Sequence, residues 1–246
     1  MVGRLIIRGD AESTQDLARE MALQGAPAGT AVMALNQTRG RGRMGRSWIS
    51  PPGKNLALSL LLRPTLLPRD APLLGLLASI AVAETVEDAG VPEARLRWPN
   101  DVLVSDKKIA GILSEASMDD RSVEFVIVGV GLNVNAQESD FPADLPTPAT
   151  SVLMCTGRES DLEQTARRLL GHMDRLYEKL NREGSGFVPP LWESRWAHCG
   201  VRLTHKKVTG VGHGIGSDGA LLLKTDQGRI ERITSGEVLP AESTRT

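Results

Sequence analysis

Apolar residues recur along this chain in two patterns, which predict a mixture of strands and helices. Short runs of apolar and β-branched residues, bounded by Gly, Pro, Asn or Asp, indicate strands. Up to residue 199 these runs cover 4–7, 30–35, 55–62, 95–98, 102–105, 108–115 and 122–133. The runs 95–98 and 102–105 flank the turn Pro99-Asn100-Asp101, so they predict a hairpin-like unit.

Other segments are predicted to be helices, because their apolar residues repeat every three or four positions or lie between helix start and stop signals. The first predicted helix begins at Ser13, and the others cover 72–89, 162–182 and 187–198. Ser13 and Asp16 predict a capping box at the first helix. Asp70 is expected to cap the second helix and Gly90 to end it. A loop rich in Pro, Ser and Asp is predicted at 136–150.

From residue 200 the pattern changes to short β-type runs separated by tight turns. The runs are 201–204, 208–211, 220–224 and 229–233. Asp218-Gly219 and Gln227-Gly228 are typical turn pairs between them. The runs predict a small β-barrel of fewer than fifty residues. An independent core is marginal at that size, so we expect it to pack on its neighbour. The predicted domains are 1–199 and 200–246.

Composition narrows the class of protein. Of the 246 residues 41% are hydrophobic, which suffices for a full core and argues against global disorder. The formal net charge of −1 disfavours a dedicated nucleic-acid binder. The two cysteines and four histidines form no disulfide framework or zinc-ligand spacing. The apolar run 72–86 is too short to cross a bilayer and the N-terminus lacks a secretory pattern, so we expect a cytoplasmic protein.

The segment 38–48 carries the clearest chemical signal. It holds four arginines within eight residues, separated by three glycines and followed by Trp48. Like charges this close repel, and glycine loses backbone entropy on ordering, so we expect the segment to be mobile until an anion binds. Glycine-rich turns and arginine side chains both bind phosphate or carboxylate. Because the rest of the chain balances this charge, the expected ligand is a small anion.

Three motifs, in the same order along the chain, resemble those of the biotin protein ligases. Residues 37–48 (QTRGRGRMGRSW) are similar to the ligand-binding loop of that family. Residues 97–101 (RWPND) and 108–113 (KIAGIL) resemble its WPND and KxxGIL motifs, and 129–133 (GVGLN) its GxGxN strand end. The run 219–223 resembles part of the family's C-terminal barrel. One motif alone would be weak, but three at compatible spacing make a strong resemblance.

The resemblance implies an α+β fold, with a mixed or antiparallel sheet, helices packed on one face and a small C-terminal β-barrel. It also implies an enzyme that condenses biotin with ATP, in the presence of Mg²⁺, to biotinoyl-5′-AMP. Biotin is then passed to one lysine of a biotin carboxyl carrier domain. Because the chain starts directly at the catalytic domain, we expect the monofunctional type without the DNA-binding winged helix. A homodimer would be compatible with the family.

The resemblance assigns the ureido ring of biotin to the start of the first predicted helix and to the loop edge. Ser13, Thr14 and Gln37 offer hydroxyl and amide groups that suit a neutral urea. Taken alone, Ser13 and Thr14 suit a plain helix N-cap equally well. Gln15 stands where the family usually has Asn, and its role is left open.

The loop is expected to close over the adenylate. Its expected ligand-binding residues are Gly40, Arg41, Gly42, Arg43 and Trp48. Arg41 and Arg43 are the expected catalytic cations of the loop, because a carboxylate that attacks a phosphate needs fixed positive charge. Arg39 and Arg46 are left without a role.

Lys108 is the expected catalytic ammonium, since it would neutralise both the carboxylate of biotin and the α-phosphate of ATP. Gly111 on the same strand would allow close approach of the ligand. Asn100 and Asp101 are expected near the phosphates, with Asp101 as a magnesium ligand. The strand end is expected to contact adenine through Gly129, Gly131 and Asn133.

Two alternative functions follow from the same features. A lipoate–protein ligase has a similar catalytic fold and also activates an acid for a carrier lysine, although the Arg/Gly loop and the KxxGIL spacing favour biotin. A nucleic-acid-binding module would use the basic loop and would bind with a steep salt dependence. The near-neutral net charge counts against this second alternative.

Overall fold

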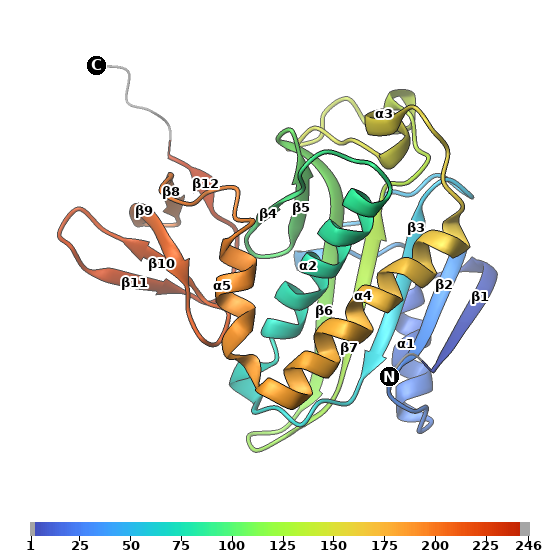
Figure 1. Ribbon diagram of the computed structural model, residues 1–246, viewed down its shortest axis with the longest axis horizontal. Helices are drawn as coiled ribbons and strands as arrows, with labels where there is room; N and C mark the ends of the chain where they lie inside the picture. The colour runs from blue at the N-terminus through green and yellow to red at the C-terminus, as the bar shows by residue number, and fades with distance from the viewer. Residues whose placement is uncertain (1–2, 242–246) are drawn as a thin grey trace.

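The structure, a computed structural model, describes residues 3–241 and is built around a seven-stranded mixed sheet (Figure 1). The strands are β1 (Arg4–Ala11), β2 (Thr30–Gln37), β3 (Leu56–Leu62), β4 (Arg95–Arg97), β5 (Asp101–Val104), β6 (Lys107–Met118) and β7 (Val123–Leu132). Their order across the sheet is β1-β2-β3-β7-β6-β5-β4. Only β1 and β2 pair in parallel. Each predicted strand of the first 199 residues is therefore present, and β1 and β6 are each longer than expected.

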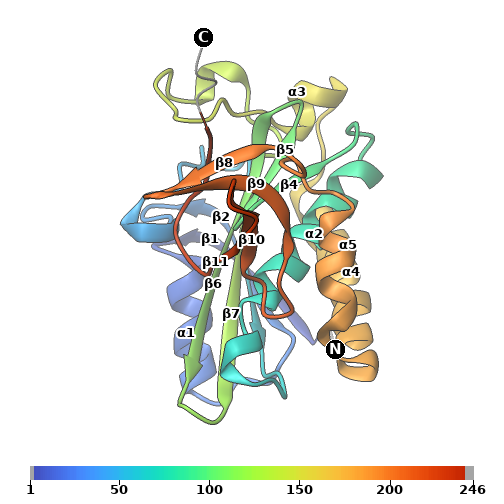
Figure 2. The same cartoon turned by 90° about the vertical axis from the view of Figure 1, so that its left-hand side faces the viewer.

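Helices cover both faces of this sheet (Figures 1 and 2). On one face α1 (Thr14–Leu23) buries Ala18 and Ala22 against Phe125 and its neighbours. On the other face α2 (Leu73–Asp88) lies over the alternate residues of the same strands, with α4 (Leu162–Glu183) beside it. The α+β class with a mixed sheet is confirmed, but α1 departs from the expected single helical face. The reason is that β2 and β3 are apolar at nearly every position, so both of their faces need a cover.

Helix α2 is apolar around its whole circumference because it is buried around most of it. It contacts the main sheet, α4 and α5 (Val188–Glu193), and Leu73 and Leu76 lie under the turn at Gly219 of the second sheet. Its sixteen residues nevertheless fall short of a bilayer's thickness. Within residues 3–241 there is no helix with both the length and the apolar character to span a membrane.

Three predictions about helix ends are wrong. Ser13 occupies the N-cap of α1, but its side chain makes no capping bond, and Asp16 pairs with Arg41 instead of completing a capping box. Helix α2 begins after Pro72, whereas Asp70 lies in a preceding 3-10 turn. The helix predicted for 187–198 ends at Glu193. At α1 the tertiary partner Arg41 decided what local propensity left open.

A second, five-stranded antiparallel sheet follows α5 (Figure 2). Its strands, in the order β11-β10-β9-β8-β12, are β8 (Arg202–His205), β9 (Val208–Ile215), β10 (Leu221–Lys224), β11 (Ile230–Ile233) and β12 (Leu239–Pro240). Leu221 belongs to the same buried core as α2, and Trp98 Nε1 donates a hydrogen bond to the Gly219 carbonyl at 3.0 Å. This sheet therefore packs against the main domain, as its small size predicts. The predicted domain 200–246 extends past the described residues, since 242–246 lie outside them.

We predict that Phe125→Ala destabilises the fold by about 3–5 kcal/mol, because it leaves a cavity between α1 and the sheet. Phe125 is only 1% exposed and packs in the smaller core under α1. Urea unfolding would measure the change. The matched control is Leu23→Ala at the end of α1, where the side chain is 67% exposed and the expected change is within about 0.5 kcal/mol. Equal effects of the two substitutions would contradict the α1 packing.

Candidate active site

A cavity of about 350 Å³ opens on the α1 side of the main sheet. Strands β3, β6 and β7 form its floor, the first turn of α1 forms one wall, and the segments 41–49 and 237–240 cover it. With the exception of Gly40, the predicted site residues all line it: Ser13, Thr14, Gln37, Arg41, Gly42, Arg43, Trp48, Asn100, Asp101, Lys108, Gly111, Gly129, Gly131 and Asn133. The fold thus brings together segments that are far apart in the sequence.

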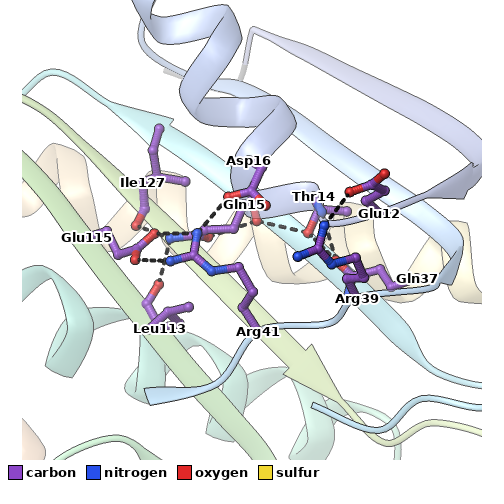
Figure 3. Close-up of polar contacts among 11 residues, drawn as sticks. Glu12, Thr14, Gln15, Asp16, Gln37, Arg39, Arg41, Leu113, Glu115 and Ile127 are labelled. Atoms are coloured by element: carbon purple, nitrogen blue, oxygen red, sulfur yellow. Dashed lines mark hydrogen bonds and ion pairs between the residues drawn. The ribbon is translucent and has the colours of Figure 1, made fainter. Parts of the chain in front are cut away.

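The wall at α1 is polar. The Thr14 backbone N–H and hydroxyl both lie within hydrogen-bond distance of Gln37 Oε1, at 2.8 and 3.0 Å (Figure 3). Thr14 Oγ1 is also 3.0 Å from Ser59 Oγ. Ser13 lines the same wall, and its buried hydroxyl oxygen has no hydrogen-bond partner within residues 3–241. A buried, unpaired hydroxyl is costly, so this wall is suited to a ligand that carries neutral donors and acceptors.

Gln15, whose role the sequence left open, locks α1 onto the sheet. Its Nε2 donates to the carbonyls of Leu113 and Ile127 at 3.3 and 3.2 Å, and its Oε1 accepts from Ser59 Oγ at 3.0 Å (Figure 3). A Cβ atom at Gly129 would collide with Gln15 Oε1. The absence of a side chain at Gly129 therefore makes room for Gln15, in addition to any ligand.

The floor of the cavity carries the indole of Trp48. Gly111 and Gly131 are paired across β6 and β7, so two adjacent positions of the sheet have no side chain. A Cβ atom at Gly131 would clash with Trp48 Cε2 and Nε1, and one at Gly111 would be 3.1 Å from Trp48 Cζ3. Lys108 Nζ lies 5.5 Å from the centre of the indole, at cation–π distance. The close approach that the glycines predict is thus made by the protein's own tryptophan.

Asp101 lies between two cations. Its Oδ2 accepts from Arg97 at 2.6 Å, and its Oδ1 lies 2.6 Å from Lys108 Nζ. Arg97 also donates to Thr147 Oγ1 at 3.0 Å. Together with the isolated β-bridge between Lys108 and Ala149, this bond joins Arg97, Asp101 and Lys108 to the loop 141–149. With both oxygens on cations, Asp101 does not fit the expected role of a magnesium ligand. Nor do any three His, Cys, Asp or Glu side chains of residues 3–241 gather into a metal site.

Arg43 is the loop arginine that faces the cavity. It donates to Asn100 Oδ1 at 3.2 Å, and Asn100 itself is held on β6 by bonds to and from the Ile112 backbone. Burial lowers the pKa of the Arg43 guanidinium from its ordinary value, whereas Glu237 and Asp101 act in the opposite direction. The group remains charged near neutral pH, as guanidinium groups in proteins do. Arg43 thus keeps its charge available at the cavity.

The other three arginines of the loop are paired with carboxylates. Arg39 binds Glu12 at 3.1 Å, Arg41 binds both Asp16 and Glu115 at 2.6 Å, and Arg46 binds Glu237 of the second sheet. These pairs cancel most of the repulsion that predicts a mobile loop. Arg41 lines the cavity as expected, but its guanidinium is held by carboxylates, and its catalytic role stays a prediction (Figure 3).

Two further predicted site residues are used mainly by the protein itself. The Asn133 amide accepts from Asn55 at 3.3 Å and donates to the Thr150 carbonyl at 3.0 Å, so it joins the end of β7 to the loop before α3 (Val152–Thr156). Gly40 accepts a hydrogen bond from the Trp48 N–H at 2.9 Å, which closes the base of the loop. Both residues are therefore placed as scaffold of the site.

Several cavity residues gave no signal in the sequence. They come from the loop 141–149, from the segment 237–240 and from His198 between the two sheets. His198 Nδ1 is buried and has no partner within residues 3–241. Burial lowers the pKa of His198, the nearby Arg97 lowers it further, and Asp106 raises it. Contacts between the two sheets are decided by the tertiary fold, so no local pattern could reveal these residues.

Comparison with known proteins agrees with this geometry. Residues 9–133 match the model of the Biotin/lipoate A/B protein ligase family, and 198–239 match the biotin protein ligase C terminal domain. The Bifunctional ligase/repressor BirA of Bacillus subtilis is 37% identical over 243 residues, with 97% of this chain and 74% of the relative covered. The Biotin--[acetyl-CoA-carboxylase] ligase of Paracoccus denitrificans is 37% identical over 218 residues, with 85% of this chain and 87% of that protein covered.

Solved structures give the same result. Biotin protein ligase from Aquifex aeolicus in complex with biotin and ATP superimposes with a TM-score of 0.77 at 30% identity, covering 96% of this chain and 97% of the other. The fold and the cavity define a ligase of the biotin and lipoate type, and the chain belongs to the Biotin/lipoate A/B protein ligase family. Within it, the C-terminal domain and the relatives identify a biotin protein ligase.

We predict that Gly131→Ala displaces Trp48 from the floor, because the added methyl group would overlap the indole. Overpacking of this kind costs about 1–3 kcal/mol. Tryptophan fluorescence together with urea unfolding would detect both effects. The control is Gly171→Ala in α4, where nothing lies within 4 Å of the added atom and a helix interior gains from Ala. Unchanged fluorescence and stability in Gly131→Ala would contradict the packing of Trp48.

We predict a pH effect on stability through His198. Its folded pKa lies below the unfolded value of about 6.5, so the unfolded chain binds the proton first as the pH falls. Stability is therefore lost on acidification through about pH 6.5, and His198→Gln should remove part of that loss. Urea unfolding of both proteins at pH 7.5 and pH 5 measures the difference. An equal loss in the two proteins would show that His198 does not contribute.

Proposed function

We infer that this protein activates biotin with ATP to biotinoyl-5′-AMP and then transfers biotin to a lysine of a biotin carboxyl carrier domain. The family relationship supports the ligase activity. The observation that carries the proposal is the division of one cavity into two halves. Unpaired and matched hydroxyl and amide groups lie at the α1 wall, and the cations Lys108 and Arg43 lie at the opposite side.

The polar half suits the ureido ring of biotin. We propose that Ser13 and Thr14 contact its carbonyl and N–H groups, with Gln37 holding Thr14 in place. A buried urea needs matched donors and acceptors, and the unpaired Ser13 hydroxyl supplies one of them. The glycine floor and Trp48 would then support the chain that leads from the ring to the carboxylate.

The cationic half suits adenylation. In this step a carboxylate oxygen of biotin attacks the α-phosphorus of ATP, a new oxygen–phosphorus bond forms and pyrophosphate leaves. Two anions meet, so fixed positive charge stabilises the transition state. Lys108 and Arg43 are the proposed cations, and Asp101 would keep the Lys108 ammonium aimed at the cavity. Arg41 is omitted from this role because carboxylates hold it.

Magnesium belongs to this proposal only as the counter-ion of ATP, where it would screen the phosphate charge. Asp101 is not the proposed ligand, because Arg97 and Lys108 occupy its two oxygens. In the second step the carrier's lysine amine attacks the acyl carbon and AMP leaves. This nucleophile comes from the carrier, so the ligase needs none of its own. We also propose a cytoplasmic location and a homodimer.

Incubation of the protein with biotin, Mg-ATP and a biotin carboxyl carrier domain tests the function. The expected result is pyrophosphate release and a mass gain on the carrier equal to one biotinoyl group. Acylation only with lipoate in place of biotin would assign the alternative lipoate ligase activity. Tight DNA or RNA binding without biotin would assign the nucleic-acid-binding alternative, against which the pairing of three loop arginines already argues.

We predict that Lys108→Ala slows adenylate formation by at least about a hundredfold, because it removes a charge that stabilises the transition state. Single-turnover formation of the adenylate measures the rate, and circular dichroism checks that the fold is intact. The matched control is Lys107→Ala, at an exposed position next to Lys108 on the same strand, which should keep the wild-type rate. Normal adenylation in Lys108→Ala would contradict the assigned role.

A further inference from the structure

Arg41 of the ligand loop is held by two carboxylates from different elements (Figure 3). Its guanidinium binds Glu115 through two nitrogens, at 2.6 and 3.3 Å, and Asp16 at 2.6 Å. Asp16 lies in the first turn of α1, and Glu115 lies on β6. We call these three residues the outer clamp. It joins the loop to both the helix and the sheet that build the cavity.

The position of Glu115 follows from the alternation of side chains along β6. Gly111, Leu113 and Glu115 share the face that carries the cavity, whereas Ser114 points at α2 on the other face. Gly111 and Leu113 line the cavity and Glu115 lies just beyond it, where it meets Arg41. Neither Glu115 nor Asp16 lines the cavity. The clamp carboxylates are therefore placed to act on the loop and not on a ligand.

The geometry divides the loop arginines into two kinds. A guanidinium bound by a forked contact to one carboxylate and a single contact to a second has most of its donors used. For Arg41 to grip a phosphate through these same donors, the contacts with Asp16 and Glu115 would have to break. Arg43, two residues later, donates to Asn100 and faces the cavity. One arginine thus anchors the loop and the other is free to meet an anion.

We propose that Asp16 and Glu115 are positioning residues of the ligase: from outside the cavity they hold the Arg41 guanidinium and fix the base of the ligand loop, so that Arg43 meets the adenylate and retains it. This inference rests on the proposed function. The isolated bridge between Arg41 and Ser47 extends the effect, because it ties the two sides of the loop together at the clamp.

The experiment forms the biotinoyl-adenylate on the full chain and measures its dissociation rate after a chase with excess unlabelled biotin. Glu115→Gln and Asp16→Asn should each release the adenylate about three- to tenfold faster, the scale of a partly exposed ion pair with good geometry. Glu115→Asp keeps the charge and should restore part of the retention. The matched control is Glu12→Gln, which removes the exposed pair with Arg39 in the same loop and should leave the rate unchanged.

Two readouts separate a clamp from a general structural effect. Release from the wild type should quicken with rising ionic strength, because salt screens exposed charges, whereas release from Glu115→Gln should respond less. Arg41→Gln combined with Glu115→Gln should be no faster than Arg41→Gln alone, because the interaction lost with Glu115 is already absent without Arg41. Wild-type release in both Glu115→Gln and Asp16→Asn, or an equal effect of Glu12→Gln, would overturn the proposal.

A ligand-free measurement keeps this inference separate from the proposed function. Trypsin cleaves after arginine, so the rate of cleavage within 39–46 reports how well the loop is held in the protein without substrates. Glu115→Gln and Asp16→Asn should be cut several-fold faster than the wild type and Glu12→Gln. If the wild type makes no adenylate, the proposed function fails, while this cleavage pattern still decides whether the clamp holds the loop.

Discussion

The pairing of Gly111 with Gly131 leaves two neighbouring positions of the main sheet without side chains, and the rest of the site is arranged around that gap. The Trp48 indole lies in it, closer to Gly131 than any Cβ atom would permit. Because the indole is seated there, the glycine-rich loop passes over the sheet instead of extending into solvent. Lys108 Nζ then lies over the ring and beside Asp101. A side chain at Gly131 would lift the loop and its arginine away from the cavity.

The positive charge available to a ligand depends on which basic residues are paired with carboxylates, not on how many basic residues the loop contains. Four arginines in the loop suggest a strongly cationic lid, yet carboxylates hold three of them. The cations left for ligand anions are Arg43 and Lys108, and each is oriented by a neighbour, Asn100 or Asp101. Such prior orientation is what electrostatic catalysis requires, since fixed charges need no rearrangement as the transition state forms. It also explains how a chain with net charge −1 can bind two anions.

Local pattern sufficed for the strands, the long helices and the motif residues, because each depends on a short stretch of sequence. The sequence also contains the information needed to predict that α1 covers the second face of the sheet. The runs 30–35 and 55–62 are apolar on both faces, which indicates a sheet covered on both sides. The partners of the loop arginines were not predictable. Arg41 and Arg46 pair with Glu115 and Glu237, 74 and 191 residues further along the chain. Such pairs exist only once the sheet order is set.

The small second sheet links the stability of the fold to the site. Its core residues, Leu221 among them, are buried against the main domain, so its position depends on α2 and α5. From that position Glu237 reaches Arg46 in the ligand loop, and the segment 237–240 covers the cavity. The loop is therefore tied at one end to α1 and β6 through Arg41 and at the other end to the second sheet through Arg46. Loosening of either attachment would move Arg43, which lies between them, without any change to a residue that touches the ligand.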